Sequence, residues 1–258
     1  MSKAKQGKVV PKYGWLPDRP DHRDLMYSAP IQTIKKLQAK VDLRAGCPKI
    51  YDQGQLGSCT ANALSGAFEF ARIKQRLKDF MPSRLFLYYN ERVMQGTVNS
   101  DSGAYIREGI KSLNVSGICP EKEWPYIITK FADKPPKQCY TDALKSTIKS
   151  YQRLTNTNLT QLQSCLAQGF PFVFGFTVYE SFESQQVATT GMMPMPQPQE
   201  KVVGGHAVMA VGYDDSKQAV LARNSWGTSW GIRGYFYMPY AYITNANLCD
   251  DFWTIRIV

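Results

Sequence analysis

The hydrophobic pattern changes from a helical period to strand-like runs partway along the chain, and this change restricts the possible folds most strongly. Small and apolar residues recur at helical spacing from residue 59 onward, and further helices are expected at 83–93, 104–113 and 159–168. Strands are expected at 170–178, 206–213, 219–223, 234–238 and 252–258, with a hairpin turn at 214–217. Helices followed by strands are typical of an α+β protein with two packed lobes.

Length and composition exclude several classes of protein. A chain of 258 residues with 43% hydrophobic and 20% charged residues has ordinary globular usage, which excludes disorder of the whole chain. The strongest apolar run, at 170–176, has the length of a strand, so no membrane span is expected. The basic first residues are followed by no apolar core, so we expect a cytoplasmic location or another compartment that is reached without a signal peptide.

The net charge of +10 lies mostly in the N-terminal segment. Residues 1–50 carry 11 Lys/Arg and 4 Asp/Glu, a net of +7, whereas residues 51–258 carry 20 and 17, a net of +3. The main domain therefore has no strongly basic face, and we expect no nucleic-acid partner. Residues 1–40 are interpreted as a basic N-terminal arm, with a disordered tail as the alternative.

The cysteine pattern gives no support to a metal site. None of the six cysteines lies two or four residues from another, as structural zinc sites require, and the chain has only two histidines. We therefore expect no metal and no cofactor, and reduced thiols in the absence of a secretory signal. The cysteines are Cys47, Cys59, Cys119, Cys139, Cys165 and Cys249.

Cys59 differs from the other cysteines because it stands where a glycine-bearing loop becomes a helix, with Ser58 as the expected N-cap. The positive end of the helix dipole and the unpaired N–H groups there favour the reactive thiolate. His206 follows two glycines and opens an apolar strand, which for a lone histidine is more often a structural position in the core.

Four motifs around these two residues change that interpretation. Together, and in this order, they resemble the papain-like (cathepsin-type) cysteine proteases, nearest to short prokaryotic or viral members, over residues 41–258. The resemblance implies a two-lobed papain-like fold, with a helical left lobe at about 41–150, an antiparallel β-barrel-like right lobe at about 151–258 and the active-site cleft between them. The motifs are Gln53-x5-Cys59, Gly57-Ser58-Cys59, Gly205-His206-Ala207-Val208 and Asn224-Ser225-Trp226-Gly227, the last continuing to Tyr235.

The resemblance also implies roles for single residues. Cys59 would be the nucleophile, His206 the general acid and base, and Asn224 the residue that orients the imidazole. The side-chain amide of Gln53 and the backbone N–H of Cys59 would bind the oxyanion. Trp226 would shield the hydrogen bond between histidine and asparagine from water, a role compatible with that of an ordinary core tryptophan.

The substrate-binding positions are implied less directly. Ser102 and Gly103 stand where the family has the Gly-Gly pair that supports the substrate backbone, and Gly57 lies beside the nucleophile. Gly205 replaces the polar residue that often precedes the catalytic histidine, which would leave the S2 pocket more open.

The expected function is that of a monomeric cysteine endopeptidase that hydrolyses polypeptide substrates through a thioester on Cys59. Residues 1–40 are expected to be a short inhibitory prosegment, because the stretch 13–24 combines aromatic residues with stiff prolines and could occupy subsites. Three alternatives stay open: an acyl transferase with the same triad, a catalytically silent binding protein on the same fold, and an arm packed away from the cleft.

Overall fold

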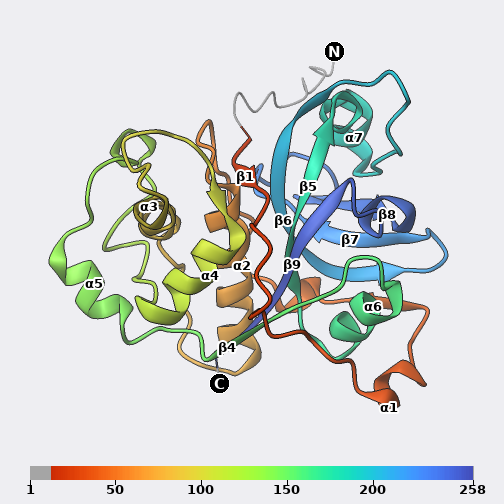
Figure 1. Cartoon of the computed structure of the whole chain (residues 1–258), viewed down its shortest axis with the longest axis horizontal. Coiled ribbons are helices and arrows are strands. Elements are labelled where there is room, and N and C mark those ends of the chain that lie inside the picture. Colours follow the sequence, from red (N-terminus) through yellow and green to blue (C-terminus); the bar gives the residue numbers. More distant parts are fainter. Residues whose placement is uncertain (1–12, 258) are drawn as a thin grey trace.

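A helix of 16 residues, α2 (Cys59–Lys74), lies in the middle of the molecule, between a group of helices and a large sheet (Figure 1). The computed structural model describes residues 13–257; the first twelve residues of the expected arm and the last residue of the expected C-terminal strand lie outside the described residues. Residues from Cys59 through Phe70 are all buried, because α2 packs against helices on one side and against the sheet on the other. The α+β prediction is confirmed.

The start of α2 differs from the prediction in one detail. Ser58 does precede the helix, but its hydroxyl makes no capping hydrogen bond. It is bound instead by the Tyr126 hydroxyl at 2.5 Å and by the Asn62 amide at 3.0 Å. The side chain therefore ties the loop before α2 to the helical lobe.

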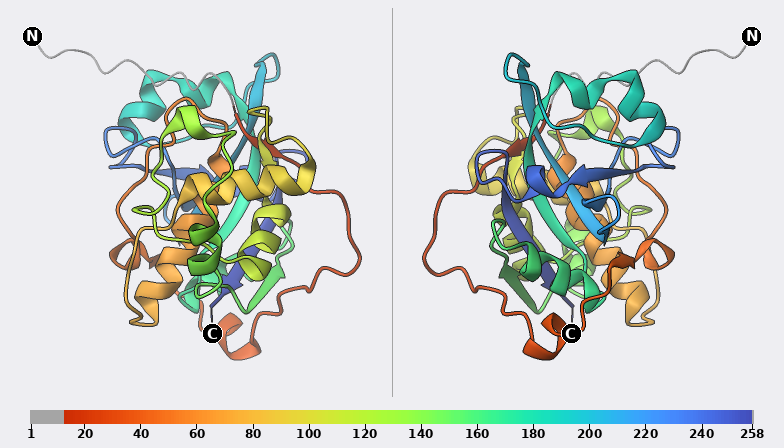
Figure 2. Two further views of the ribbon diagram at one scale, coloured as in Figure 1. Left: turned by 90° about the vertical axis from the view of Figure 1, so that its left-hand side faces the viewer. Right: turned by 90° about the vertical axis from the view of Figure 1, so that its right-hand side faces the viewer.

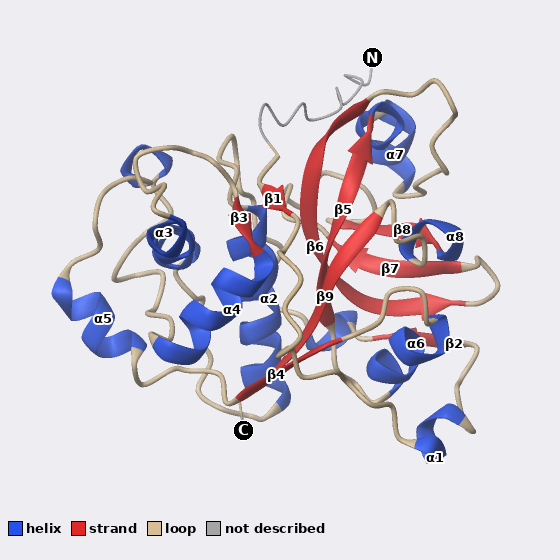
Figure 3. Ribbon diagram, viewed as in Figure 1, coloured by secondary structure: helices blue, strands red, loops and turns tan. Residues whose placement is uncertain are grey.

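The helical lobe contains α3 (Arg84–Gln95), α4 (Ile106–Val115) and α5 (Lys137–Ala143), which Figure 3 shows on the opposite side of α2 from most of the sheet. Ser83 caps α3 by accepting a hydrogen bond from Phe86 N, and Gly96 ends that helix in the left-handed region. The helices expected at 83–93 and 104–113 are thus confirmed with small shifts of their ends, whereas α5 was not expected.

The other lobe is built on a seven-stranded antiparallel sheet with the order β4-β9-β5-β6-β7-β8, in which β2 also pairs with β6. The strands expected in the second half are confirmed as β5 to β9, and the turn at 214–217 joins β6 to β7. Helices α6, α7 and α8 flank the sheet, and α6 was expected. The elements are β2 (Lys40–Asp42), β4 (Ser150–Arg153), α6 (Leu159–Ala167), β5 (Phe172–Tyr179), α7 (Gln185–Thr190), β6 (Val202–Asp214), β7 (Ala219–Arg223), β8 (Tyr235–Pro239), α8 (Tyr240–Ile243) and β9 (Cys249–Arg256).

The N-terminal arm, from Tyr13 to the start of β2, passes between the two groups of elements (red in Figure 1). Its first strand, β1 (Trp15–Leu16), pairs in parallel with β3 (Ala104–Tyr105) of the helical lobe. The segment after β1 runs along one edge of the molecule to the short helix α1 (Ile31–Ile34), as Figure 2 shows. No helix within residues 13–257 is long and apolar enough to cross a membrane.

Candidate active site

Cys59 is the first residue of α2 and is completely buried. Burial raises the pKa of its thiol to about 12, while the backbone N–H groups of Ala207 and Gly14 oppose that rise. The expected preference for the thiolate is therefore wrong for this arrangement. The helix N-terminus is present, but the arm removes the water that a charged sulfur needs.

His206 lies in β6 and is completely buried. Its Nε2 forms a 2.8 Å hydrogen bond with Oδ1 of Asn224. The same Oδ1 also accepts a hydrogen bond from Ser225 N at 2.8 Å, which fixes the orientation of the amide. Nε2 must therefore carry the hydrogen, so the neutral imidazole keeps its lone pair on Nδ1.

The His206 side chain has no exposed surface. Burial lowers the pKa of His206 to about 4, and the hydrogen bond to Asn224 opposes that change. Nδ1 has no hydrogen-bond partner within residues 13–257. The Trp226 ring lies 5.0 Å from the imidazole, centroid to centroid, and is itself buried. With the arm in place, burial therefore favours the neutral forms of both the thiol and the imidazole.

Gln53 joins the same site from the loop before α2. Its Oε1 accepts a 2.6 Å hydrogen bond from Ser225 Oγ, and its Nε2 donates one to Leu56 O at 2.9 Å. Both bonds lock the amide in one orientation, with one N–H of Nε2 left over. The structure thus brings Gln53 and Asn224 together through Ser225, which sequence reasoning did not select although it lies inside one of the motifs.

The predicted substrate-binding glycines line the path of the arm. A Cβ atom on Gly103 would lie 2.3 Å from Gly14 O, and one on Gly205 would lie 2.5 Å from Trp15 O. Conversely, a Cβ on Gly14 would lie 1.7 Å from Gly57 O. Backbone meets backbone at all three places, so the alternative of an arm packed away from the cleft is wrong.

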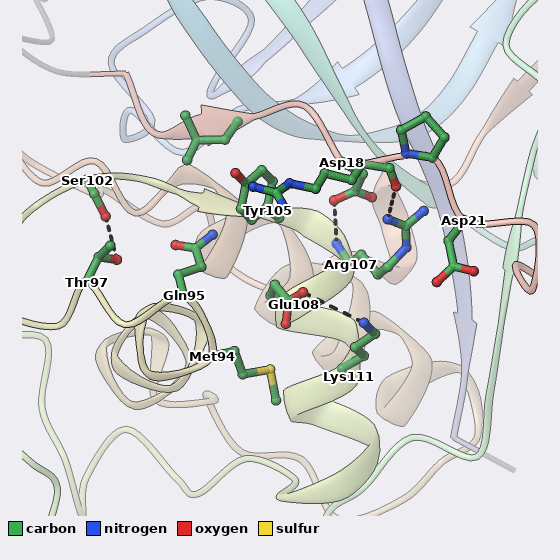
Figure 4. Close-up of a pocket in the computed structure, with 13 residues that line it drawn as sticks. Asp18, Asp21, Met94, Gln95, Thr97, Ser102, Tyr105, Arg107, Glu108 and Lys111 are labelled. Carbon is green, nitrogen blue, oxygen red and sulfur yellow. Dashed lines mark hydrogen bonds and ion pairs between the residues drawn. The ribbon is translucent and has the colours of Figure 1, made fainter.

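Ser102 lies beside the path of the arm, next to Gly103. Its hydroxyl donates to Thr97 Oγ1 at 2.9 Å and does not contact the arm strand by a hydrogen bond. The hydrogen bond to the arm comes from Ala104, two residues further along, whose backbone N–H donates to Gly14 O at 2.7 Å. Ser102 also belongs to the wall of a cavity of about 470 Å³ between the arm and α4, which Figure 4 shows.

The loop around Gly103 and Gly57 is held by residues that the sequence did not reveal. Asp101 accepts hydrogen bonds from Gly57 N at 3.1 Å and from the Tyr88 hydroxyl at 2.5 Å. The Tyr88 oxygen in turn accepts a hydrogen bond from Gly103 N at 3.1 Å. No spacing signal links these positions, because they lie on different elements.

The arm continues over the cleft through a buried polar cluster. Trp15 Nε1 donates to Asp251 Oδ2 at 3.0 Å, and Asp18 N donates to the same oxygen at 2.7 Å. Asp18 accepts from Arg107 N at 3.2 Å, as Figure 4 shows, and from Trp253 Nε1 at 3.1 Å. The cluster fixes the arm to both lobes.

One group of potential metal ligands occurs among residues 13–257. The Cys119, Glu123 and Cys139 ligand atoms lie within 4.8 Å of one another, in the helical lobe. Burial raises the pKa of both thiols, so metal binding would have to displace their protons. Three donors also fall short of the four that a closed structural zinc site uses.

Comparisons with known proteins agree on one family. A family model described as papain family cysteine protease matches residues 37–251. The peptidase C1-like protein L477 of Acanthamoeba polyphaga mimivirus is 42% identical over 95% of this chain and 87% of its own length. Xylellain, a cysteine protease from Xylella fastidiosa, is 45% identical, with a TM-score of 0.91 over 100% of this chain and 99% of that one. Procathepsin L 3 of Tenebrio molitor larval midgut, at 22% identity and a TM-score of 0.70 over 91% and 74%, shares the fold.

Proposed function

This chain belongs to the papain family of cysteine proteases, and we propose that it is an endopeptidase that works through a thioester on Cys59 and is held inactive by its own N-terminal arm. The observation that carries the proposal is the burial of Cys59, at the N-terminus of α2, together with the hydrogen-bonded pair of His206 and Asn224. The arm lies against this site, with the Tyr13 ring beside His206 and Gly14 packed on the backbone of Gly57.

The proposed reaction begins once the arm has left and water and substrate can enter. Solvation then lets the Cys59 proton move to Nδ1 of His206, which gives a thiolate beside an imidazolium. The thiolate forms a bond to the scissile carbonyl carbon, and the C=O π electrons move to the oxygen. The C–N bond breaks as His206 gives its proton to the leaving amine. Water, deprotonated by His206, then hydrolyses the thioester and restores the thiol.

Asn224 and Gln53 support these steps from fixed positions. Asn224 holds the Nε2–H of the imidazole, so Nδ1 is the nitrogen that exchanges protons with sulfur and amine. The free N–H of Gln53 and the backbone N–H of Cys59 stabilise the charge that develops on the carbonyl oxygen. Loss of one such donor costs about 2.7–4 kcal/mol of transition-state stabilisation.

The inhibitory role of the arm follows from what it covers. Gly14 packs against the backbone of Gly57, two residues before Cys59, and Tyr13 stands edge-on to His206 with ring centroids 5.9 Å apart. Trp15, the next residue, packs its side chain against Gly175 and Gly205 of the sheet. Cys59 and His206 have no exposed surface in this arrangement, so a peptide cannot reach them until the arm moves.

The test is hydrolysis of a mixed fluorogenic peptide library under reducing conditions. It compares the full chain with its Gly14→Val variant, because any Cβ at residue 14 collides with Gly57 O and must lift the arm from the cleft. The full-length variant is preferable to deletion of residues 1–40, because Tyr27 of the arm is buried in the core. Leu25→Ala, at an arm position that is 66% exposed, is the matched control.

We expect weak cleavage by the full chain and by Leu25→Ala, strong cleavage by Gly14→Val, and none by Gly14→Val combined with Cys59→Ala. Cleavage that survives Cys59→Ala would overturn the proposed nucleophile. Equal cleavage by the full chain and by Gly14→Val would overturn the inhibitory arm.

A further inference from the structure

The side chain of Trp15 fills a cavity that the sheet has left open for it. A Cβ atom on Gly175 in β5 would lie 1.9 Å from the indole ring, and one on Gly205 in β6 would lie 2.9 Å from it. The three atoms nearest to the added Cβ at Gly175 all belong to Trp15. The cavity therefore exists because two neighbouring strands each lack a side chain at this point.

The floor of this cavity is the carboxylate of Asp251 in β9, which has no exposed surface. Asp251 has φ of +58°, a left-handed conformation that non-glycine residues rarely adopt, at a place where the pairing of β5 with β9 is irregular. Such backbone strain is common at ligand-binding positions. Here it accompanies a carboxylate that faces the cavity, with Oδ2 against the indole N–H.

Both hydrogen bonds to Asp251 Oδ2 come from the arm. They are donated by Trp15 Nε1 at 3.0 Å and by Asp18 N at 2.7 Å, while Arg153 binds the other oxygen at 3.2 Å. When the arm leaves, Oδ2 loses both of these donors, and water can take their place at the bottom of an indole-sized cavity. A donor-free substrate side chain would expel that water and leave Oδ2 a buried acceptor without a donor. An unsatisfied buried acceptor is costly, so a ligand that restores the hydrogen bond is favoured over one that only fills the space.

The cavity is also next to the reacting atoms. Gly14, the residue before Trp15, packs against the backbone of Gly57, two residues before Cys59, and Gly205, which packs against Trp15, directly precedes His206. A substrate side chain in this cavity would therefore belong to a residue close to the scissile bond.

We infer that Asp251, at the floor of the Trp15 cavity, makes the released protease select large substrate side chains ending in an N–H donor, tryptophan and arginine, over donor-free side chains of similar size. This inference rests on the proposed function. Tryptophan reproduces the contact that the arm makes. Arginine supplies donors on a long apolar stem and would face Asp251 Oδ2, since Arg153 contacts the other carboxylate oxygen.

The experiment uses the full-length double variant Gly14→Val/Trp15→Ala, in which the arm is displaced and its side chain cannot compete for the cavity. Fluorogenic peptides vary each of the two residues before the scissile bond. Tryptophan is compared with benzothienylalanine, which replaces the N–H by sulfur at nearly the same shape, and arginine is compared with norleucine.

At one of the two positions we expect kcat/KM to be at least about tenfold higher for the donor-bearing member of each pair. Asp251→Asn should lower the tryptophan-to-benzothienylalanine ratio several-fold. Gly175→Ala narrows the cavity without touching its floor. At the same position it should reduce kcat/KM for peptides with tryptophan relative to peptides with alanine. Gly46→Ala, at a distant glycine beside Phe70, is the matched control and should keep the parent ratios.

Equal rates within both pairs, or a preference for aliphatic side chains at both positions, would overturn the pocket. A Gly175→Ala variant with the same substrate preferences as the parent protein would also overturn the inference. This comparison still tests the inference if Asp251→Asn fails to fold. If the double variant cleaves no peptide of the mixed library, the proposed function fails. If it cleaves the library without any N–H preference, the pocket inference fails alone.

Discussion

Replacement of Trp15 by alanine in the full chain should release the arm and expose the nucleophile. The Trp15 side chain is only 7% exposed and fills the cavity above Asp251. Truncation of a buried tryptophan to alanine typically costs about 3–5 kcal/mol, which includes the cavity that it leaves. That free energy is lost from the docked arm alone, because the released arm has Trp15 in water.

Since about 1.4 kcal/mol corresponds to a factor of ten, the ratio of released to docked arm should rise by roughly two to three and a half orders of magnitude. The rate at which iodoacetamide alkylates Cys59 should rise in proportion, until the arm is released in most molecules. The measurement is the time course of carbamidomethylation of the Cys59 peptide by mass spectrometry at pH 7. Circular dichroism of the same samples shows whether the lobes stay folded.

Two further variants make the comparison quantitative. Trp15→Phe keeps most of the apolar contact but loses the hydrogen bond to Asp251, so its alkylation rate should lie between those of the wild type and Trp15→Ala. Leu25→Ala lies in the same arm at an exposed position and should alkylate at the wild-type rate. A Trp15→Ala protein that stays folded and alkylates no faster than wild type would refute the reasoning, since the arm would then be held by other contacts.

Three more predictions concern the site and its surroundings. In the Gly14→Val background, Gln53→Ala should reduce kcat by about 10²- to 10³-fold through loss of one oxyanion donor, and steady-state kinetics that show an unchanged kcat would contradict its role. Asn224→Ala leaves the Nε2–H of His206 without its acceptor and should lower kcat/KM about 10- to 100-fold, with a changed pH profile as the sign of a misoriented imidazole. Glu91 is completely buried, and burial raises its pKa to about 8, so the folded state binds this proton more tightly than the unfolded state does. Stability should therefore fall as pH rises from about 4.5 to 8, and urea unfolding of Glu91→Gln across that range should show a flatter dependence.

Much of the fold could be predicted because it depends on local patterns. The alternation and apolar runs of the second half predict β5 to β9 within a few residues, since each strand is bounded by glycines or turn residues. Ser83 and Gly96 mark the ends of α3 by ordinary capping chemistry. The expectation for Ser58 was wrong, because Tyr126, distant in sequence, binds its hydroxyl.

The candidate active site could also be predicted only in part. The motifs pointed to Cys59, His206, Asn224 and Gln53, which the structure brings together at the junction of α2 and β6. They did not point to Asp101 and Tyr88, which hold the cleft loops by hydrogen bonds between separate elements. The state of the thiol was also misjudged, because its pKa depends on burial under the arm and not only on the helix end.

The sequence by itself determined the family, the type of fold and the candidate residues for the chemistry, because motif spacing and hydrophobic period are properties of the chain as written. Only the tertiary structure decided where the arm lies. It joins Trp15 to Asp251 across 236 positions of sequence and places Gly14 against the backbone of Gly57. Burial, pocket shape and pairing of distant polar groups arise when the lobes and the arm pack together, so no local pattern encodes them.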